Sequence, residues 1–441
     1  MSRTERPGAV HALRAVAHSP GALRLVLLRF ASQFGDGMFQ AALGGAILFD
    51  PQRGADPAAV AAGFAVLLLP YSLLGPFAAR ILDRVDRAVV LGVASTLKVL
   101  LIAGATWLLL AGASNTVVLT TALATVGASR FVLAGLSASL PHVVPTSALV
   151  TTNAALVTLG SVVSAVGALA AVTVLGLVGP SDRSTAIATG ISAIGALLAA
   201  IAARGFVRGR LGPDGTATRR EDDGGWTSGF AAVRRTRSVA APLVGVGAHR
   251  IAFGVDTLIM ILLLRDTARS SILPGGVAGF GLTIGAAAAG MFVAAVATPV
   301  LLPRLGSTRT VVAALSLAAL AQTALVATLI PDLLILGAFL LGAAGQTVKL
   351  TADAAMQTDI PDDRRGRVFA IQDTTFNVAF VGAIAVAALV IGPQSTGVDS
   401  TLATACVLVG AGIYALAAVV ALRLVSERTT TTGVPSPRPP D

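Results

Sequence analysis

The sequence is poor in charged residues, in aromatic residues and in cysteine. Charged side chains make up 12% of its 441 residues and aromatic ones 5%, whereas 55% are hydrophobic and the mean hydropathy is +0.82. A soluble domain usually carries about 25% charged residues. The shortage extends along the whole chain and therefore excludes a string of soluble domains. The single cysteine, Cys406, lies in an apolar run and excludes an intrachain disulfide.

Sequence patterns for several kinds of chemistry are missing as well. The chain has no cluster of metal ligands at suitable spacing, no phosphate-binding loop and no nucleophile constellation. We therefore expect no metal site, no cofactor and no enzymatic activity, and we do not expect ATP to be the energy source. A membrane-embedded acyl- or glycosyltransferase stays as an alternative, although it would need acidic or histidine clusters in a sizeable loop outside the membrane.

Long apolar runs are what the sequence has in abundance. A bilayer core requires about 20 apolar residues per helix. Polar breaks separate twelve such runs, near residues 23–49, 58–80, 88–111, 116–140, 151–178, 184–203, 241–264, 276–302, 310–330, 333–357, 367–392 and 401–423. The sequence thus predicts an all-α membrane protein with twelve transmembrane helices.

Basic residues lie mainly on one side of these runs. If both termini are cytoplasmic, the inside segments hold 23 basic residues and the outside loops hold four, Arg53, Arg183, Arg265 and Arg269. This asymmetry follows the positive-inside rule. It predicts a multi-pass protein of the plasma membrane with both termini in the cytoplasm. Insertion and contact with anionic lipids account for the net charge of +10, so we expect membrane lipids and no nucleic acid as partners.

The longest polar break divides the chain into two halves of six runs. The expected parts are a cytoplasmic N-terminal segment 1–22, an N-terminal six-helix bundle 23–203, a cytoplasmic linker 204–240, a C-terminal six-helix bundle 241–424 and a disordered cytoplasmic tail 425–441. Within the linker, residues 226–237 suit a short interfacial helix carrying arginines toward lipid headgroups. A flexible segment is the equally open alternative.

The two halves repeat several polar positions. RFASQFGD, which starts at Arg29, has a counterpart in RIAFGVD, which starts at Arg250. The loop DRVDR at 83–87 corresponds to PRLGSTR at 303–309. Two six-helix halves with repeated polar positions suit a transporter, in which the substrate binds near the midplane at the repeat interface.

Some of these segments resemble a known family. The loop AARILDRVDR at 78–87 resembles the loop Gly-x-x-x-Asp-Arg-x-Gly-Arg of the major facilitator superfamily, with Ala79 and Asp86 in place of the two glycines. SRFVLAGLSASLP at 129–141 resembles the family's motif with a buried arginine, here Arg130. The resemblance covers essentially the whole chain. It implies the major facilitator fold, with two pseudo-symmetric six-helix bundles.

Two further phrases point to a branch within that family. LPHVVPTSALVTTNA at 140–154 and QTDIPDDRRGRVFAIQD at 357–373 resemble the macrolide-efflux and siderophore-exporter branch. The resemblance implies a secondary active transporter that moves small molecules by alternating access.

Asp36 is an acidic residue within an apolar run. Asp36 lies near the middle of the first run, where a charged residue costs roughly 2.5–3.5 kcal/mol on insertion scales. Arg29 is on the same face but about 10 Å away along the helix axis, too far for a direct ion pair. Asp36 therefore either carries a coupling proton or cation, contacts the substrate, or is a structural acid satisfied by a neighbouring hydroxyl or backbone group. Asp256 in the seventh run is its repeat counterpart.

The candidate residues fall into three sets. Those for proton coupling or the substrate cavity are Asp36, Arg130, Asp256, Gln33, Gln40 and Arg29. Those for conformational gating, in short cytoplasmic loops, are Asp83, Arg84, Arg87, Arg304 and Arg309. The secondary candidates are Lys349, Asp353 and Asp373. Lys349 and Asp353 are four residues apart on one helix face, which also suits a structural ion pair. The resemblance implies that Arg130 modulates a nearby carboxyl group, and a packing partner of Asp36 is the alternative.

Together these features predict a monomeric, proton-coupled secondary transporter. Its expected partners are a small-molecule substrate and protons, and its expected action is efflux of hydrophobic or amphipathic drug-like molecules. Siderophore or lysolipid transport, import, and a non-transporting receptor built on the same fold stay open as alternatives.

Overall fold

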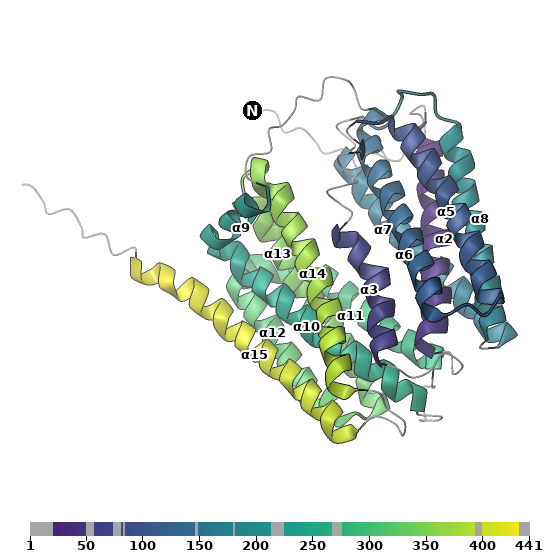
Figure 1. Cartoon of the computed structure of the whole chain (residues 1–441). Coiled ribbons are helices and arrows are strands. Elements are labelled where there is room, and N and C mark those ends of the chain that lie inside the picture. The colour runs from purple at the N-terminus through teal and green to yellow at the C-terminus, as the bar shows by residue number, and fades with distance from the viewer. Residues whose placement is uncertain are drawn as a thin grey trace, which may run out of the picture. The chain divides into compact units, whose positions relative to one another are not determined.

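The computed structural model describes residues 21–49, 57–73, 81–82, 84–145, 149–179, 181–212, 225–266, 276–392 and 399–431. Every regular element in these ranges is a helix (Figure 1). The chain divides into two compact units, one of Met1–Gly54 with Ala62–Arg220 and the other of Ala55–Ala61 with Glu221–Asp441.

The helices of the first half of the chain precede residue 212. They are α2 (Ala22–Phe49), α3 (Pro57–Leu73), α5 (Arg87–Leu110), α6 (Asn115–Ser139), α7 (Leu149–Val178) and α8 (Asp182–Arg204). The second half holds α9 (Gly225–Arg235), α10 (Arg237–Asp266), α11 (Gly276–Leu305), α12 (Ser307–Ala324), α13 (Pro331–Asp359), α14 (Asp362–Ile391) and α15 (Ser400–Thr431).

Each of the twelve expected apolar runs overlaps one of these helices. Ten helices of the described ranges are long and apolar enough to cross a membrane. The prediction of an all-α membrane protein is therefore confirmed. α2 and α3 are not among the ten. α2 has 28 residues, enough length to span a bilayer, but it carries Arg24, Arg29 and Asp36, whereas α3 has 17 residues.

Helix α9 lies inside the segment 204–240 that was expected as a linker. Of the two alternatives for its end, the helix is the one observed, and α10 already begins at Arg237. Ala232 and Val233 are buried, whereas Phe230 is exposed. Arg367 of α14 donates a hydrogen bond to Ser228 Oγ at 2.8 Å. α9 is thus an amphipathic helix fixed to α14 of the same unit.

The end of the chain also differs from expectation. Helix α15 continues to Thr431, so the first residues of the segment 425–441, expected as a disordered tail, are helical. No glycine or proline occurs between Gly412 and Gly433, and the helix can therefore extend past its apolar part. The rest of this segment and residues 1–20 lie outside the described residues.

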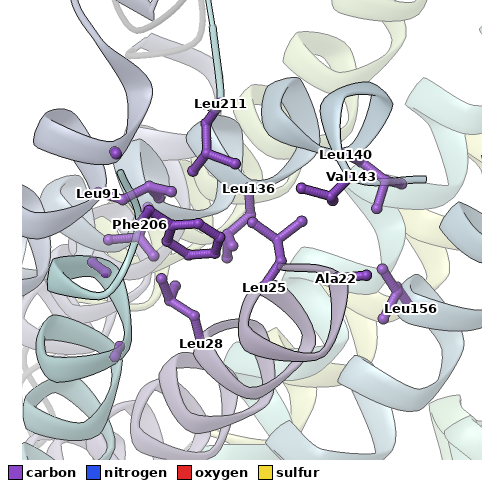
Figure 2. Packing of buried hydrophobic residues seen from close by; sticks show 14 of the residues in the cluster. Ala22, Leu25, Leu28, Leu91, Leu136, Leu140, Val143, Leu156, Phe206 and Leu211 are labelled. Atoms are coloured by element: carbon purple, nitrogen blue, oxygen red, sulfur yellow. The ribbon is translucent and has the colours of Figure 1, made fainter. Parts of the chain in front are cut away.

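A cluster of buried apolar side chains joins several helices at one end of the N-terminal unit. Leu28 of α2, Leu91 of α5 and Leu136 of α6 surround the ring of Phe206, which follows α8 (Figure 2). Leu211 completes the cluster and is fully buried. The cluster therefore ties the turn after α8 to α2, α5 and α6.

Glycines bring α2 very close to its neighbours α7 and α8. A Cβ added at Gly37 would overlap the backbone carbonyl of Ser164 in α7. A Cβ at Gly195 of α8 would similarly overlap the backbone of α2 at Ala31. Small residues at such crossings are typical of helix packing in membranes, because van der Waals contact replaces the hydrophobic effect as the driving force.

This packing gives a first prediction. Changing Gly37→Ala should destabilise the N-terminal unit by about 1–3 kcal/mol, since the added methyl group forces α2 and α7 apart. The matched control is Gly44→Ala on the same helix, where an added Cβ meets no atom within 4 Å. Thermal unfolding of the purified variants in detergent measures the difference. Equal stability of the two variants would contradict the close contact.

Candidate functional site

Polar side chains from three helices of the N-terminal unit converge on Asp36. Lys98 Nζ of α5 lies 2.7 Å from Asp36 Oδ1. Ser129 Oγ of α6 donates to the same oxygen at 2.6 Å, and Ser32 Oγ lies 3.4 Å from Oδ2. Lys98 also donates to Ser32 Oγ at 3.0 Å. The side chain of Lys98 is 1% exposed and that of Asp36 is 18% exposed. The group is a buried, hydrogen-bonded ion pair.

This geometry settles which cation contacts Asp36. Sequence reasoning offered Arg130 as its charge neighbour, and Arg130 does lie close enough for an electrostatic attraction to Asp36. The ion pair in direct contact, however, is made by Lys98, which that reasoning missed. Burying a single charge costs free energy because the charge loses its hydration. The attraction and hydrogen bonds between two opposite charges offset this cost only when both are present. The carboxyl group of Asp36 is consequently held in direct contact with an ammonium group.

The other candidates on α2 are Arg29, Gln33 and Gln40. Arg29 is 5% exposed, and its Nε has no hydrogen-bond partner among the described residues. The amide of Gln33 lies against Gly160 of α7, in the space that a Cβ at this glycine would occupy. Gln40 is half-buried and, four residues after Asp36, shares its helix face.

The second acid, Asp256, has different surroundings in the C-terminal unit. Gln322 Nε2 of α12 donates to Asp256 Oδ1 at 2.5 Å, and the same nitrogen lies 3.4 Å from the carbonyl oxygen of Val407 in α15. Within the described ranges, Asp256 Oδ2 and Gln322 Oε1 are both buried without a hydrogen-bond partner. No ion pair to Asp256 occurs among those residues. Asp256 therefore has a neutral amide as its partner, whereas Asp36 has an ammonium group.

The two arrangements correspond to each other in the repeat. Asp36 and Asp256 lie on the first long helix of each half, α2 and α10, and their partners Lys98 and Gln322 lie on α5 and α12. In apolar surroundings a carboxylate without a cation costs far more than the neutral acid. Asp256 can therefore take up a proton without breaking an ion pair, whereas Asp36 cannot.

Arg250 does not serve as a cation for Asp256. Its guanidinium lies 3.9 Å from the ring centre of Phe376 and 4.2 Å from that of Phe380. Its Nε donates to the carbonyl oxygen of Phe376 at 3.1 Å. Aromatic faces attract a cation through their quadrupole. The neighbouring His249 is buried and forms a 2.9 Å hydrogen bond between its Nδ1 and Tyr414 Oη.

The secondary candidates form one cluster between α13 and α14. Lys349 Nζ lies 2.8 Å from Asp353 Oδ2, which is the ion pair expected from their spacing. Gln372 Nε2 of α14 donates to Asp353 Oδ1 at 2.9 Å. Asp373 interacts electrostatically with both Lys349 and Asp353. The cluster joins two helices of the C-terminal unit.

Among the gating candidates, Arg87 binds backbone carbonyl groups. Asp83 lies outside the described residues. Arg87 Nη1 donates to the carbonyl oxygens of Ala138 at 2.9 Å and Leu211 at 3.2 Å. Ala138 lies in the last turn of α6, where carbonyl groups lack intrahelical donors, and Leu211 lies in the turn region after α8. The remaining three, Arg84, Arg304 and Arg309, are exposed and form no ion pair among the described residues.

Lys98 and Gln322 are the two partners that sequence reasoning overlooked. A signal for Lys98 exists, because the chain contains only two lysines and both lie in apolar runs. Gln322 carries no such signal, since a neutral amide in an apolar helix is unremarkable. In the described ranges, no group of three or more His, Cys, Asp or Glu side chains could hold a metal ion.

Comparison with known proteins identifies relatives over the full length. Residues 25–384 match the Major Facilitator Superfamily. A protein of Mycobacterium tuberculosis (strain ATCC 25618 / H37Rv), named as an uncharacterized MFS-type transporter, is 41% identical over 433 residues. That alignment covers 97% of this chain and 96% of the relative.

Solved structures resemble the fold at low sequence identity. A mutant of the nucleoside transporter NupG has a TM-score of 0.68 and 13% identity, over 91% of this chain and 99% of that one. A mutant of the peptide transporter POT has a TM-score of 0.67 and 14% identity, over 94% and 98% of the two chains. At such identities the likeness extends to the fold alone.

Proposed function

Because this chain belongs to the major facilitator superfamily, we propose that it is a proton-coupled exporter of hydrophobic or amphipathic small molecules, working by alternating access. It is a multi-pass membrane transporter and not an enzyme. The asymmetry of its basic residues supports a location in the plasma membrane with both termini in the cytoplasm. We propose that it acts as a monomer.

One observation carries the coupling part of the proposal: Asp256 and Gln322 each bury an oxygen that lacks a hydrogen-bond donor among the described residues. A carboxylic acid and a primary amide are complementary, because each offers one donor and one acceptor. A proton on Asp256 Oδ2 supplies the donor that both oxygens lack. Binding that proton removes an uncompensated charge and completes the hydrogen bonding of the pair.

The hydrogen bonds around Asp256 connect three helices of its unit, so a proton bound there can affect all three. The amide of Gln322 on α12 contacts both Asp256 on α10 and the backbone of Val407 on α15. Loss of the proton removes the O–H···O bond to Gln322 Oε1 and turns the partner of Gln322 Nε2 into a charged acceptor, so the hydrogen bonding of the amide changes. A change of hydrogen bonding among α10, α12 and α15 is the step that would link the proton to alternating access.

The direction of transport and the substrate class rest on the sequence. The phrases at 140–154 and 357–373 resemble the macrolide-efflux and siderophore-exporter branch of the family. We propose that Arg84, Arg304 and Arg309 take part in charge pairs between helices that form in one access state and break in the other, while Arg87 keeps its carbonyl partners within one unit.

Export can be tested in everted membrane vesicles. Vesicles from cells that overproduce the protein should accumulate the amphipathic probes Hoechst 33342, ethidium or erythromycin more than vesicles that lack it. Collapse of the pH gradient with nigericin should abolish the difference, because inward movement of the probe is exchanged for protons. Accumulation that persists after nigericin would contradict proton coupling. Release of the probes instead of uptake would contradict export.

A further inference from the structure

The outer surface of the N-terminal unit has an open groove between α5 and α8, with a volume of about 550 Å³. Its floor consists of small side chains, among them Gly92 and Thr96 of α5 and Ala203 of α8. A Cβ added at Gly92 would touch only the Cβ of Ala203, at 3.9 Å. The Thr96 hydroxyl donates to the carbonyl oxygen of Gly92 at 2.8 Å. The floor therefore presents no polar group that still needs a partner.

The walls of the groove are apolar and face outward. Val93, Leu97 and Leu100 are exposed by 63%, 47% and 64%. Because α5 is apolar enough to span a membrane, this face meets lipid acyl chains. The lining runs along α5 from Ala88 to Leu100, which is about 18 Å at 1.5 Å per residue. One leaflet contributes about half of a 30 Å hydrocarbon core, so the groove matches the length of an acyl chain in a single leaflet.

Two arginines stand at one end of this groove. Arg204 ends α8 and Arg208 follows in the next turn, and both are exposed. Their turn is fixed to the start of α5, since Gly209 N donates to Asp86 Oδ2 at 2.7 Å. Asp86 also accepts from Ala88 N at 2.9 Å, so its carboxylate is already engaged. The positive charge at the mouth is thereby held in place and left available to a ligand.

A third arginine, Arg24 of α2, also contacts this turn. Arg24 of α2 donates to the carbonyl oxygen of Gly205, and its guanidinium lies 5.6 Å from the ring centre of Phe206. That ring lies in the buried cluster beside Leu91 (Figure 2). The mouth of the groove is therefore built on the core of the unit and is not a mobile surface loop.

We propose that this groove binds an anionic glycerophospholipid of the cytoplasmic leaflet, with one acyl chain on the floor and the phosphate at Arg204 and Arg208. An apolar slot of one-leaflet length with positive charge at its end is complementary to such a lipid in both shape and charge. Guanidinium groups bind phosphate oxygens in pairs. The cytoplasmic leaflet is the one that carries the anionic lipids, and the arginine-rich end of α8 faces it in the orientation given above. The lipid would fasten α5 to α8.

Native mass spectrometry of the full-length protein in detergent tests this site. Wild-type protein should retain phosphatidylglycerol in preference to phosphatidylcholine with the same acyl chains. Changing Arg204→Gln and Arg208→Gln should weaken phosphatidylglycerol binding about fivefold per arginine removed. Changing Gly92→Leu should weaken binding of both lipids, because the leucine side chain occupies the floor.

Two control variants match these changes on the same helices. Arg183→Gln removes an exposed arginine at the opposite end of α8, and Gly104→Leu adds a leucine to α5 outside the groove lining. Both should bind as the wild type does. In addition, phosphatidylglycerol with a photoactivatable acyl chain should label residues 88–100 of the wild-type protein, a readout that needs no variant.

Three results would each overturn the proposal. The first is wild-type binding of phosphatidylglycerol that is no tighter than that of phosphatidylcholine. The second is a double arginine variant that binds like Arg183→Gln, and the third is photolabelling that avoids residues 88–100.

Discussion

Changing Lys98→Met is expected to destabilise the N-terminal unit by about 3–5 kcal/mol, the cost of removing one partner of a buried ion pair. The variant leaves the Asp36 carboxylate with the Ser129 and Ser32 hydroxyls but without its contacting ammonium group. Chemical unfolding of the purified protein in detergent, followed by circular dichroism, measures the loss.

The second lysine of the chain provides the matched control. Lys349 pairs with Asp353 on the same helix, with a side chain that is 35% exposed. Changing Lys349→Met should therefore cost less than about 1 kcal/mol. The double change Asp36→Asn with Lys98→Met should regain much of the stability that Lys98→Met loses, because neither charge is left alone. Equal losses for the two lysine variants would contradict the assignment of the N-terminal ion pair.

Changing Asp256→Asn should reduce gradient-driven accumulation of a transported probe at least tenfold. Movement of the probe down its own concentration gradient should continue. The asparagine amide can donate to Gln322 Oε1 and accept from Gln322 Nε2, so it imitates the protonated acid. Stability should stay within about 1 kcal/mol of the wild type, because a neutral group replaces a neutral group. Everted vesicles with and without a pH gradient measure both kinds of movement.

Asp332→Asn is the control for that experiment. Asp332 lies in the first turn of α13, at the end of the helix, so its loss should leave accumulation intact. Asp36→Asn is a second comparison, and it should lower stability because Lys98 loses its counter-ion. Continued uphill accumulation by Asp256→Asn would contradict the role of Asp256 as the proton carrier.

Most of the long helices were predictable because each contains a long apolar run. A run of about 20 apolar residues in a membrane protein must satisfy its own backbone hydrogen bonds, and a helix does so within one segment. Asp36 was predictable as an unusual residue for the same reason, since its cost depends on depth along a single helix.

The partner of Asp36 was harder to predict. Lys98 carries the same cost as Asp36 in an apolar run, but its pairing depends on which faces of α2, α5 and α6 meet. That contact is set by tertiary packing, and a single sequence does not specify it. Gln322 was missed for a different reason, because its neutral amide barely lowers the hydropathy of α12.

Helix α9 illustrates how packing decides an ambiguous segment. Its sequence, Gly225–Arg235, contains glycine and several polar residues, so propensity favoured neither a helix nor a flexible segment. In the folded unit, Gly229 lies against Ile371 and Arg367, and Arg367 binds Ser228. Contacts with α14, which are remote in sequence, therefore stabilise the helix.

The central claim of this account is that Asp256 holds an exchangeable proton, whereas Asp36 is a carboxylate paired with Lys98. Infrared spectroscopy at neutral pH tests it directly, since a protonated carboxyl group has a carbonyl stretching band that a carboxylate lacks. The difference spectrum of wild type minus Asp256→Asn should contain this band, and that of wild type minus the Asp36→Asn, Lys98→Met double variant should not. A band in the second spectrum and none in the first would contradict the account.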